Sequence, residues 1–127
     1  FYKIVVIYAL GPIPIAVLVF ETILNGMALF SHSNIALPAR LDFLCRKLIV
    51  TPDMHRIHHS IEVSETNSNY GFNLSIWDRL LGTYKEEAIK AQSEIVIGID
   101  AFRHPNELTF YNLLVMPKKY GKLTYVT

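Results

Sequence analysis

The chain of 127 residues is poor in cysteine and contains no block of consecutive basic residues. A single cysteine, Cys45, excludes an internal disulfide, fits a reducing compartment and provides no set of thiolates for a structural zinc site. The net charge of +1 argues against nucleic acid as a partner. We find no internal repeat and no low-complexity segment, and the length indicates one domain.

Charge is also nearly absent near the N-terminus, where Glu21 is the one charged residue between Ile4 and Leu29. Ile13 to His32 predicts one helix of about 20 residues, which is long enough to cross a hydrocarbon core of about 30 Å. A carboxylate inside such a span is a functional candidate, so Glu21 is expected to lie on a pocket or ligand path or close to an interface. A buried hairpin of a soluble protein is the alternative.

The segment before this helix is apolar too. Gly11-Pro12-Ile13-Pro14 should interrupt helical structure, so Phe1 to Leu10 is interpreted as the end of a preceding helix whose start is missing. Lys3 would then lie deep in the membrane unless it snorkels or lines a polar interior. The first residue is not Met, which also suggests a fragment that lacks an upstream part.

Residues 40–50 form an amphipathic pattern after the break at Leu37-Pro38. The pattern predicts a helix with an apolar stripe of Leu41, Leu44 and Leu48, flanked by Arg40, Arg46 and Lys47. Such a helix can lie at a membrane surface or pack against other helices. Basic residues after the apolar helix favour a cytoplasmic position for His32 and everything that follows it.

Weaker patterns predict the remaining elements. We expect a polar loop over Ile61–Asn69, a short helix over Asn73–Leu81 that ends at Gly82, a short strand over Glu94–Ile99, and a helix over Pro105–Met116 that ends at Pro117. In the helix over Asn73–Leu81, the side chains expected to pack are Leu74, Trp77, Leu80 and Leu81, with Trp77 in the core.

Three of the five histidines lie within five residues, in His55-Arg56-Ile57-His58-His59. Thr51 is a good N-cap and Pro52 suits the first helical position, so a helix should begin there. His55, His58 and His59 then share one helical face, at roughly 100° per residue. Imidazole is the commonest metal ligand, so this face predicts a metal site. The alternative is a solvated, histidine-rich helix end.

His32, at the end of the long apolar helix, can return toward this cluster after one intervening helix. Four imidazoles would then converge where the membrane span meets the part that follows. His104 precedes Pro105 in a loop-like stretch and is left out of the site.

Ligation by nitrogen alone suits iron, zinc, copper or nickel. Arg56 stands where the metalloprotease pattern His-Glu-x-x-His requires Glu, and Asp53 or Glu62 would have to act as a general base. Iron and zinc both remain open at this point.

These motifs carry a resemblance to a known family. The chain looks like the C-terminal half of the fatty acid hydroxylase and sterol desaturase superfamily, with specific motifs over Phe30–Tyr84. The residues that carry it are His32-Ser33-Asn34, Thr51 to Ser60, Asn69-Tyr70-Gly71 and Ile76 to Tyr84.

The resemblance implies an integral membrane enzyme with a non-haem di-iron centre. Such an enzyme uses O2 to hydroxylate or desaturate a lipid of sterol or fatty acyl type, with electrons from a donor of cytochrome or ferredoxin type. An unactivated C–H bond offers no acid, base or leaving group, so the metal must supply this chemistry. The expected fold is mainly α: membrane helices over residues 1–34 and a cytoplasmic, histidine-rich cap over residues 35–127.

By the same resemblance, His55, His58 and His59 match the last histidine box and His32 matches the isolated histidine before it. The two earlier boxes have no match here, so the chain is expected to be the C-terminal portion of a domain whose N-terminal half is missing. Asp78 and then Asn69 are expected to support the ligands, because a carboxylate can accept the non-ligating N–H of an imidazole.

Two other functions remain open at this stage. One is a membrane-bound, zinc-dependent hydrolase, and the other is a non-catalytic module whose histidines bind metal structurally or not at all. The residues that contact substrate, the identity of the lipid and the choice between hydroxylation and desaturation are not determined by the sequence.

Overall fold

A computed structural model describes residues 1–99 and 102–120, and only the backbone of residues 117, 119 and 120. The chain divides into two compact units, Phe1–Ile97 and Gly98–Thr127. Over the described residues every element is a helix, and the β-structure there amounts to two isolated bridges. The prediction of a mainly α fold is therefore confirmed.

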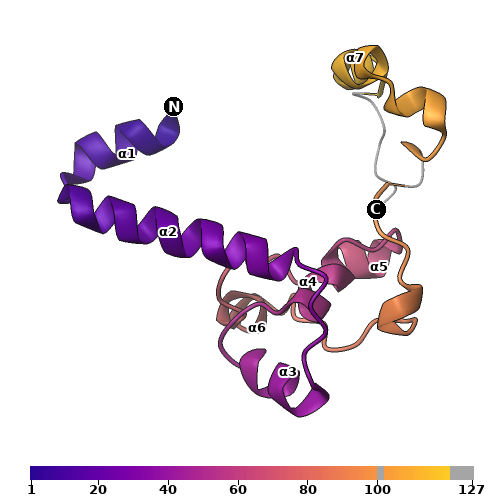
Figure 1. Cartoon of the computed structure of the whole chain (residues 1–127), viewed down its shortest axis with the longest axis horizontal. Helices are drawn as coiled ribbons and strands as arrows, with labels where there is room; N and C mark the ends of the chain where they lie inside the picture. Colours follow the sequence, from indigo (N-terminus) through magenta and orange to yellow (C-terminus); the bar gives the residue numbers. More distant parts are fainter. Residues whose placement is uncertain (100–101, 121–127) are drawn as a thin grey trace. The chain divides into compact units, whose positions relative to one another are not determined.

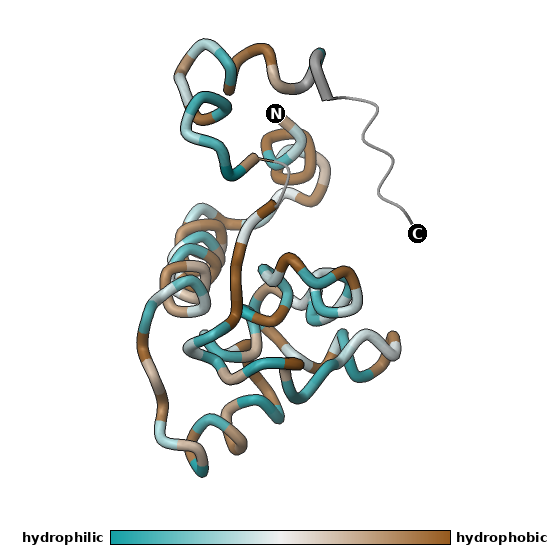
Figure 2. The backbone as a smooth tube through the Cα atoms, turned by 90° about the vertical axis from the view of Figure 1, so that its right-hand side faces the viewer, coloured by the Kyte–Doolittle hydropathy of each residue, from teal (hydrophilic) through white to brown (hydrophobic). Residues whose placement is uncertain are grey.

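The first unit begins with two apolar helices, α1 (Tyr2–Leu10) and α2 (Pro14–Ser31), joined by a tight turn (Figure 1). Gly11 ends α1 in the left-handed conformation, with φ 59°, and Pro14 begins α2. Within the described part of the chain, α2 is the one helix long and apolar enough to cross a membrane. Almost none of it is buried, unlike the core helix of a soluble protein. Figure 2 shows hydrophobic residues along α1.

An ion pair connects the two apolar helices. Lys3 Nζ lies 2.8 Å from Glu21 Oε1 and 3.0 Å from Glu21 Oε2. Each charge is thus neutralised by the other, which gives both residues a partner if the pair of helices lies in lipid. The sequence analysis identified Lys3 and Glu21 separately and did not predict that they form an ion pair.

The helices α3 (Ala39–Cys45), α4 (Pro52–His58), α5 (Val63–Thr66) and α6 (Ile76–Leu81) gather at the C-terminal end of α2 (Figure 1). The 3₁₀ helix η1 (Gln92–Glu94) follows them. Helix α4 contacts both α2 and α5. Val50, Met54 and Ile57, which lie in or beside α4, form a small apolar core that is completely buried.

Most of the other buried side chains are polar. They are Ser31, Asp42, Arg46, Thr51, His55, Ser60, Glu65, Ser68, Asn69, Ser75 and Asp78. Arg46 donates from Nη1 to the Glu86 carbonyl at 2.7 Å and pairs with Asp42. Of the three basic residues expected to flank the apolar stripe, Arg46 is therefore buried, whereas Arg40 and Lys47 are exposed.

The four apolar residues expected to pack are instead exposed, namely Leu74, Trp77, Leu80 and Leu81 on and beside α6. The stripe of Leu41, Leu44 and Leu48, expected at a membrane surface or packed against other helices, also lies on the surface of the first unit. Trp77 is 57% exposed, so its assignment to the core is wrong. The physical reason is that α4 and its polar neighbours fill the interior, which leaves these side chains outside.

Several element boundaries also differ from the predictions. The helix expected over residues 40–50 ends at Cys45, the one expected from Asn73 begins at Ile76, and the loop over 61–69 contains α5. The strand expected over Glu94–Ile99 is wrong, because only an isolated bridge between Ser60 and Ile97 forms there.

In the second unit, the 3₁₀ helix η3 (Pro105–Leu108) precedes α7 (Phe110–Tyr120). Pro117 lies inside α7 and does not end it, contrary to expectation. Proline removes one backbone hydrogen bond, and only three residues of this helix follow it.

The buried carboxylate of Asp78 connects α6 to the Tyr70-Gly71 segment. Oδ1 accepts hydrogen bonds from the Tyr70 N–H at 2.7 Å and from the Thr83 hydroxyl at 2.7 Å, and Oδ2 accepts from the Gly71 N–H at 2.8 Å. A Cβ at residue 71 would lie 2.6 Å from Asp78 Oδ2 and 2.8 Å from the Leu74 carbonyl oxygen. Only glycine therefore allows this close approach.

Asn69, whose φ is 49°, extends the same network to α4. Its amide nitrogen donates to the Met54 carbonyl at 3.1 Å and to the Lys85 carbonyl at 2.9 Å, and its amide oxygen accepts from the Lys85 N–H at 2.8 Å. Asn69 thus fixes the position of α4 relative to the segment that follows α6.

We predict that Asp78→Asn lowers the free energy of unfolding by about 1–3 kcal/mol. The amide replaces one acceptor oxygen by a donor that faces a backbone N–H, and leaving a buried donor unpaired costs about 1–3 kcal/mol. Thermal unfolding of the purified protein in detergent measures the effect. Glu94→Gln, a similar change at an exposed carboxylate, is the control. Equal stability of the two variants would contradict this account of Asp78.

Candidate metal centre

Helix α4 forms as the sequence predicts and carries most of the histidine cluster. Thr51 caps it by accepting a hydrogen bond from the Met54 N–H at 3.4 Å, and Pro52 occupies the first turn. His55 and His58 lie in α4, and His59 is its C-cap residue. His32 is the C-cap residue of α2, so two helix ends bring the imidazoles together.

Three imidazoles converge on one point through their Nε2 atoms. The Nε2–Nε2 distances are 3.2 Å between His32 and His55, 3.3 Å between His32 and His59, and 3.1 Å between His55 and His59. The ring planes are steeply inclined to one another, at 73° for His32 and His55 and at 88° for His55 and His59. The three lone pairs can therefore point to a common centre from different directions.

The protonation of these rings supports that arrangement. His32 Nδ1 lies 2.8 Å from the Ala28 carbonyl oxygen, which can only accept, so the proton resides on Nδ1 and Nε2 keeps its lone pair. Burial, together with the neighbouring imidazoles of His59, His32 and His58, lowers the pKa of His55 to about 4. Burial and the same kind of neighbours also lower the pKa of His59. At neutral pH His55 is thus uncharged and able to act as a ligand.

The distances fit one metal ion held by three nitrogens. With metal–nitrogen bonds of about 2.1 Å, two ligand nitrogens are about 3.0 Å apart in octahedral geometry and about 3.4 Å apart in tetrahedral geometry. The observed range of 3.1 to 3.3 Å lies between these values. Hydrogen bonds cannot explain all three contacts, because His32 donates its own N–H to Ala28 and can only accept at Nε2, and two neutral rings that both donate to it cannot also bond to one another. The residues present therefore fit a first-row transition metal.

His58 lies beside this group but does not join it. Its Nδ1 donates to the Ser68 carbonyl at 3.0 Å, which leaves the lone pair on Nε2. Its ring centroid lies 5.6 Å from that of His55, 5.2 Å from that of His59 and 5.5 Å from that of Tyr70. Of the four histidines expected to act as ligands, the structure groups His32, His55 and His59.

Asp78 and Asn69 lie behind α4 and make their hydrogen bonds to the backbone and to Thr83. The expected hydrogen bond from Asp78 to an imidazole N–H is not formed, although the charge of Asp78 does raise the proton affinity of His55 slightly against the other influences. Both residues act on the cluster through the position of α4 and of the Tyr70 segment.

His104 lies apart from the cluster in the sequence and in its hydrogen bonding. It is exposed and caps η3, with Nδ1 accepting from the Asn106 N–H at 3.3 Å. It belongs to the second unit, Gly98–Thr127. Its omission from the predicted site agrees with this local role.

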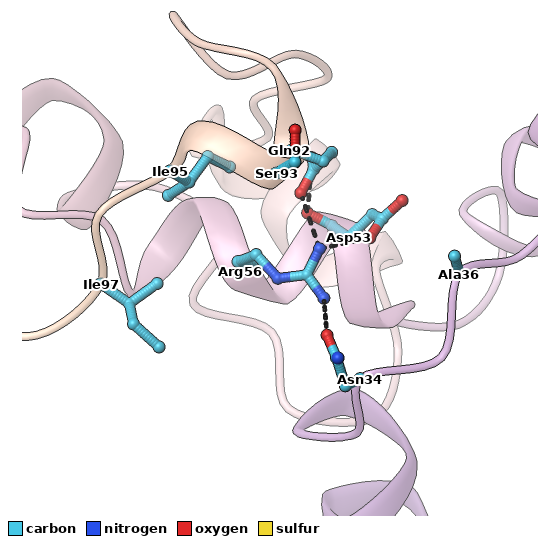
Figure 3. Close-up of a pocket in the computed structure, with 8 residues that line it drawn as sticks. All are labelled: Asn34, Ala36, Asp53, Arg56, Gln92, Ser93, Ile95 and Ile97. Atoms are coloured by element: carbon cyan, nitrogen blue, oxygen red, sulfur yellow. Dashed lines mark hydrogen bonds and ion pairs between the residues drawn. The ribbon is translucent and has the colours of Figure 1, made fainter.

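A mostly apolar cavity of about 280 Å³ opens beside the ligands, lined by His32, His59, Pro52, Arg56 and Ile97, together with Ser31 and Ser33. A neighbouring cavity contains polar side chains that the sequence reasoning did not assign, namely Asn34, Arg56 and Gln92 (Figure 3). The sequence offered a signal for Asn34 and Arg56, which lie within the histidine motifs, and none for Gln92.

Geometry and ligand type together define a candidate metal site formed by histidines alone at the end of a long apolar helix. The sequence model of the fatty acid hydroxylase family matches residues 1–83, and the chain belongs to this family. That is the assignment which the motifs of the sequence indicated. The family is membrane-bound and is known for non-haem iron.

Two curated relatives support this assignment. Ornithine lipid hydroxylase OlsE of Rhizobium tropici is 36% identical over 93 residues, which cover 72% of this chain and 27% of the relative. Alkylglycerol monooxygenase of Xenopus tropicalis is 36% identical over 55 residues, which cover 43% of this chain and 12% of the relative. The chain thus spans about a quarter or less of the length of these proteins. Among solved structures, none gives a significant match.

We predict that His55→Ala weakens metal binding by 100-fold or more. Loss of a residue that merely supports a ligand costs about 10- to 100-fold, and loss of a ligand should cost at least as much. Titration of the purified protein with Zn²⁺ against a chromophoric chelator measures the affinity. His104→Ala is the matched control and should bind like the unchanged protein, since His104 is exposed and caps η3. Unchanged affinity in His55→Ala would exclude the cluster as a metal centre.

Proposed function

We propose that this chain is the C-terminal part of a membrane-bound, non-haem di-iron oxygenase that uses O2 to hydroxylate a lipid. The single observation that carries the proposal is the convergence of three imidazole nitrogens beside an apolar cavity in a member of the fatty acid hydroxylase family. When bound, the iron centre supplies the activation of O2 that attack on an unactivated C–H bond requires.

The chain's own residues supply ligation, orientation and exclusion of water. His32, His55 and His59 offer three nitrogens to one iron. His58 is proposed to hold the second iron through Nε2, whose lone pair is free because Nδ1 carries the proton given to Ser68. The apolar wall of the cavity, with Pro52 and Ile97, would keep a hydrocarbon chain beside His32 and His59.

One iron pair needs more ligands than these four histidines. We propose that the remainder comes from a preceding half of the domain, which agrees with the greater length of both relatives. Residues 1–34 would cross the membrane with α2 as one span, and residues 35–127 would form a cytoplasmic cap. Electrons would reach the site through this cap from a donor of cytochrome or ferredoxin type.

The names of both relatives describe oxygen insertion into lipids, as a hydroxylase and a monooxygenase. Hydroxylation is therefore favoured over desaturation. A zinc hydrolase is disfavoured, because Asp53, one of its two possible bases, pairs with Arg56 at 2.7 Å and is drawn away from the imidazoles. The proposal names a lipid as the substrate and does not favour a sterol over a polar lipid.

The test uses the full-length protein that contains this chain, purified in detergent and loaded with Fe²⁺. We expect two irons per protein, O2 consumption that requires both lipid and reductant, and a product heavier than the substrate by one oxygen atom. His32→Ala should lose iron and product together, whereas His104→Ala should retain both. The 127-residue chain alone should bind fewer than two irons and form no product.

Three other outcomes would contradict the proposal or one part of it. Product formation under nitrogen, without reductant, would support a hydrolase and overturn the proposal. Full activity of His32→Ala and His58→Ala would support a non-catalytic role for the cluster. Loss of two hydrogen atoms from the substrate would replace hydroxylation by desaturation.

A further inference from the structure

A second cavity, of about 480 Å³, lies next to the cavity at the histidines, and the two share Arg56 and Ile97 in their walls. The polar side of this second cavity consists of Asn34, Asp53, Arg56 and Gln92, and its apolar side includes Ile95 and Ile97 (Figure 3). A polar compartment therefore adjoins a mostly apolar one that reaches the imidazoles.

The charges in the second cavity balance. Arg56 Nη1 donates to Asp53 Oδ1 at 2.7 Å and to Gln92 Oε1 at 3.2 Å, and both charged side chains are about four-fifths buried. Arg56 and Asp53 are the charged residues among those that line the cavity. An anion that approached Arg56 would therefore also meet Asp53, so the cavity has no net preference for negative charge.

Uncharged hydrogen-bonding groups remain accessible there. Within residues 1–99 and 102–120, the one side-chain hydrogen bond of Asn34 is a long contact of 3.5 Å, in which its Oδ1 accepts from Arg56 Nη2. Gln92 uses one amide hydrogen for the Asp53 carbonyl at 3.2 Å, which leaves its second amide hydrogen for a ligand. The exposed side chain of Ser93 adds a hydroxyl at the rim. These groups can donate to and accept from hydroxyls or amides.

We propose that this cavity binds the polar head group of the lipid substrate and selects an uncharged head that carries hydroxyl or amide groups. The apolar chain of the lipid then passes Ile97 into the cavity beside His32 and His59. This inference rests on the proposed function, which makes the cavity beside His32 and His59 the place where the lipid reacts. It adds the substrate class and the residues that determine it.

The position of these residues gives the head group control over the reacting carbon. Asn34 follows the ligand His32 by two residues, and Arg56 directly follows the ligand His55. A head group held by Asn34 and Gln92 is thus fixed relative to the imidazoles, and this decides which part of the chain lies beside them. Asn34 and Gln92 are specificity-determining residues in this proposal.

The experiment measures binding to the full-length, metal-free protein in detergent. The probes share one hexadecyl chain and differ in the head: hexadecylglycerol, hexadecyl phosphate and hexadecanol. We expect hexadecylglycerol to bind about 10-fold tighter than either of the others, equivalent to about 1.4 kcal/mol, the scale of one or two net hydrogen bonds. Asn34→Ala should remove this preference without weakening hexadecanol. Asn106→Ala, at an exposed asparagine in the second unit, is the matched control.

A second variant tests the charge balance by a gain of binding. Asp53→Asn leaves Arg56 without its anionic partner, so the affinity for hexadecyl phosphate should rise about 10-fold while that for hexadecanol stays constant. A misfolded variant cannot produce such a selective gain. In steady-state kinetics with a lipid that has an uncharged head, Asn34→Ala should raise KM and spread hydroxylation over several carbon positions, because the head no longer fixes the chain beside the imidazoles.

Three results would overturn the proposal: equal binding of all probes to the unchanged protein, tightest binding of hexadecyl phosphate, or an equal loss for hexadecanol and hexadecylglycerol in Asn34→Ala. The first would assign no head selectivity to the cavity, the second an anion site, and the third a structural role for Asn34. Because the binding assay contains no iron, head selectivity without oxygenase activity would refute the proposed function alone. Oxygenase activity without head selectivity would refute this inference alone.

Discussion

The geometry of the candidate metal centre depends on one buried carboxylate that lies outside it. Asp78 accepts two backbone N–H groups and one hydroxyl, and so holds the Tyr70-Gly71 segment against α6. Asn69, the residue before that segment, then reaches the Met54 carbonyl in α4. Helix α4 in turn positions His55 and His59 opposite His32. A displacement at Asp78 would therefore be transmitted to the imidazoles through two short hydrogen-bonded steps.

This chain of contacts explains why the interior of the first unit is polar. A seven-residue helix has few intrahelical hydrogen bonds and little apolar surface, so packing alone cannot fix it. Val50, Met54 and Ile57 supply a small apolar core. The orientation of α4 is fixed by two hydrogen bonds at Met54, whose N–H donates to Thr51 Oγ1 and whose carbonyl accepts from the Asn69 amide. Directional hydrogen bonds suit a site in which the positions of three nitrogens must be fixed to within a few tenths of an ångström. The large apolar residues of α1, α2, α3 and α6 are left outside, where lipid or other protein can cover them.

Local signals in the sequence were enough to predict the parts that depend on few residues. The N-cap Thr51 with Pro52 predicted the start of α4, and the turn at Gly11 separated the two apolar helices. The histidine spacing predicted one face with His55, His58 and His59, and the structure brings His55 and His59 together with His32, as expected, but leaves His58 beside them. These features follow from the period of a helix and from the geometry of its first turn, which the sequence contains directly.

Other features depend on which segments meet, and no local pattern carries that information. The residues 94–99 alternate like a strand, but no neighbouring strand is available to pair with them, and Ile95 and Ile97 line a cavity instead. Leu41, Leu44 and Leu48 form a regular stripe that nothing in the first unit covers. The roles of Asp78 and Asn69 were expected at the imidazoles, because a carboxylate near histidines is a familiar support. In the structure they bond to backbone groups and to the Thr83 hydroxyl, which come together only in the folded chain.

Helix α4 also connects the chemistry of the two cavities. His55 points to the other ligands, whereas Asp53 and Arg56, two residues before and one residue after it, point to the neighbouring polar cavity (Figure 3). On a helix, positions this close in sequence face different directions but move together as one rigid body. The ligands themselves carry no negative charge, and the Arg56–Asp53 pair adds no net charge beside them. A bound cation would thus retain its charge, while the adjoining compartment stays neutral and selects its occupant by hydrogen bonds.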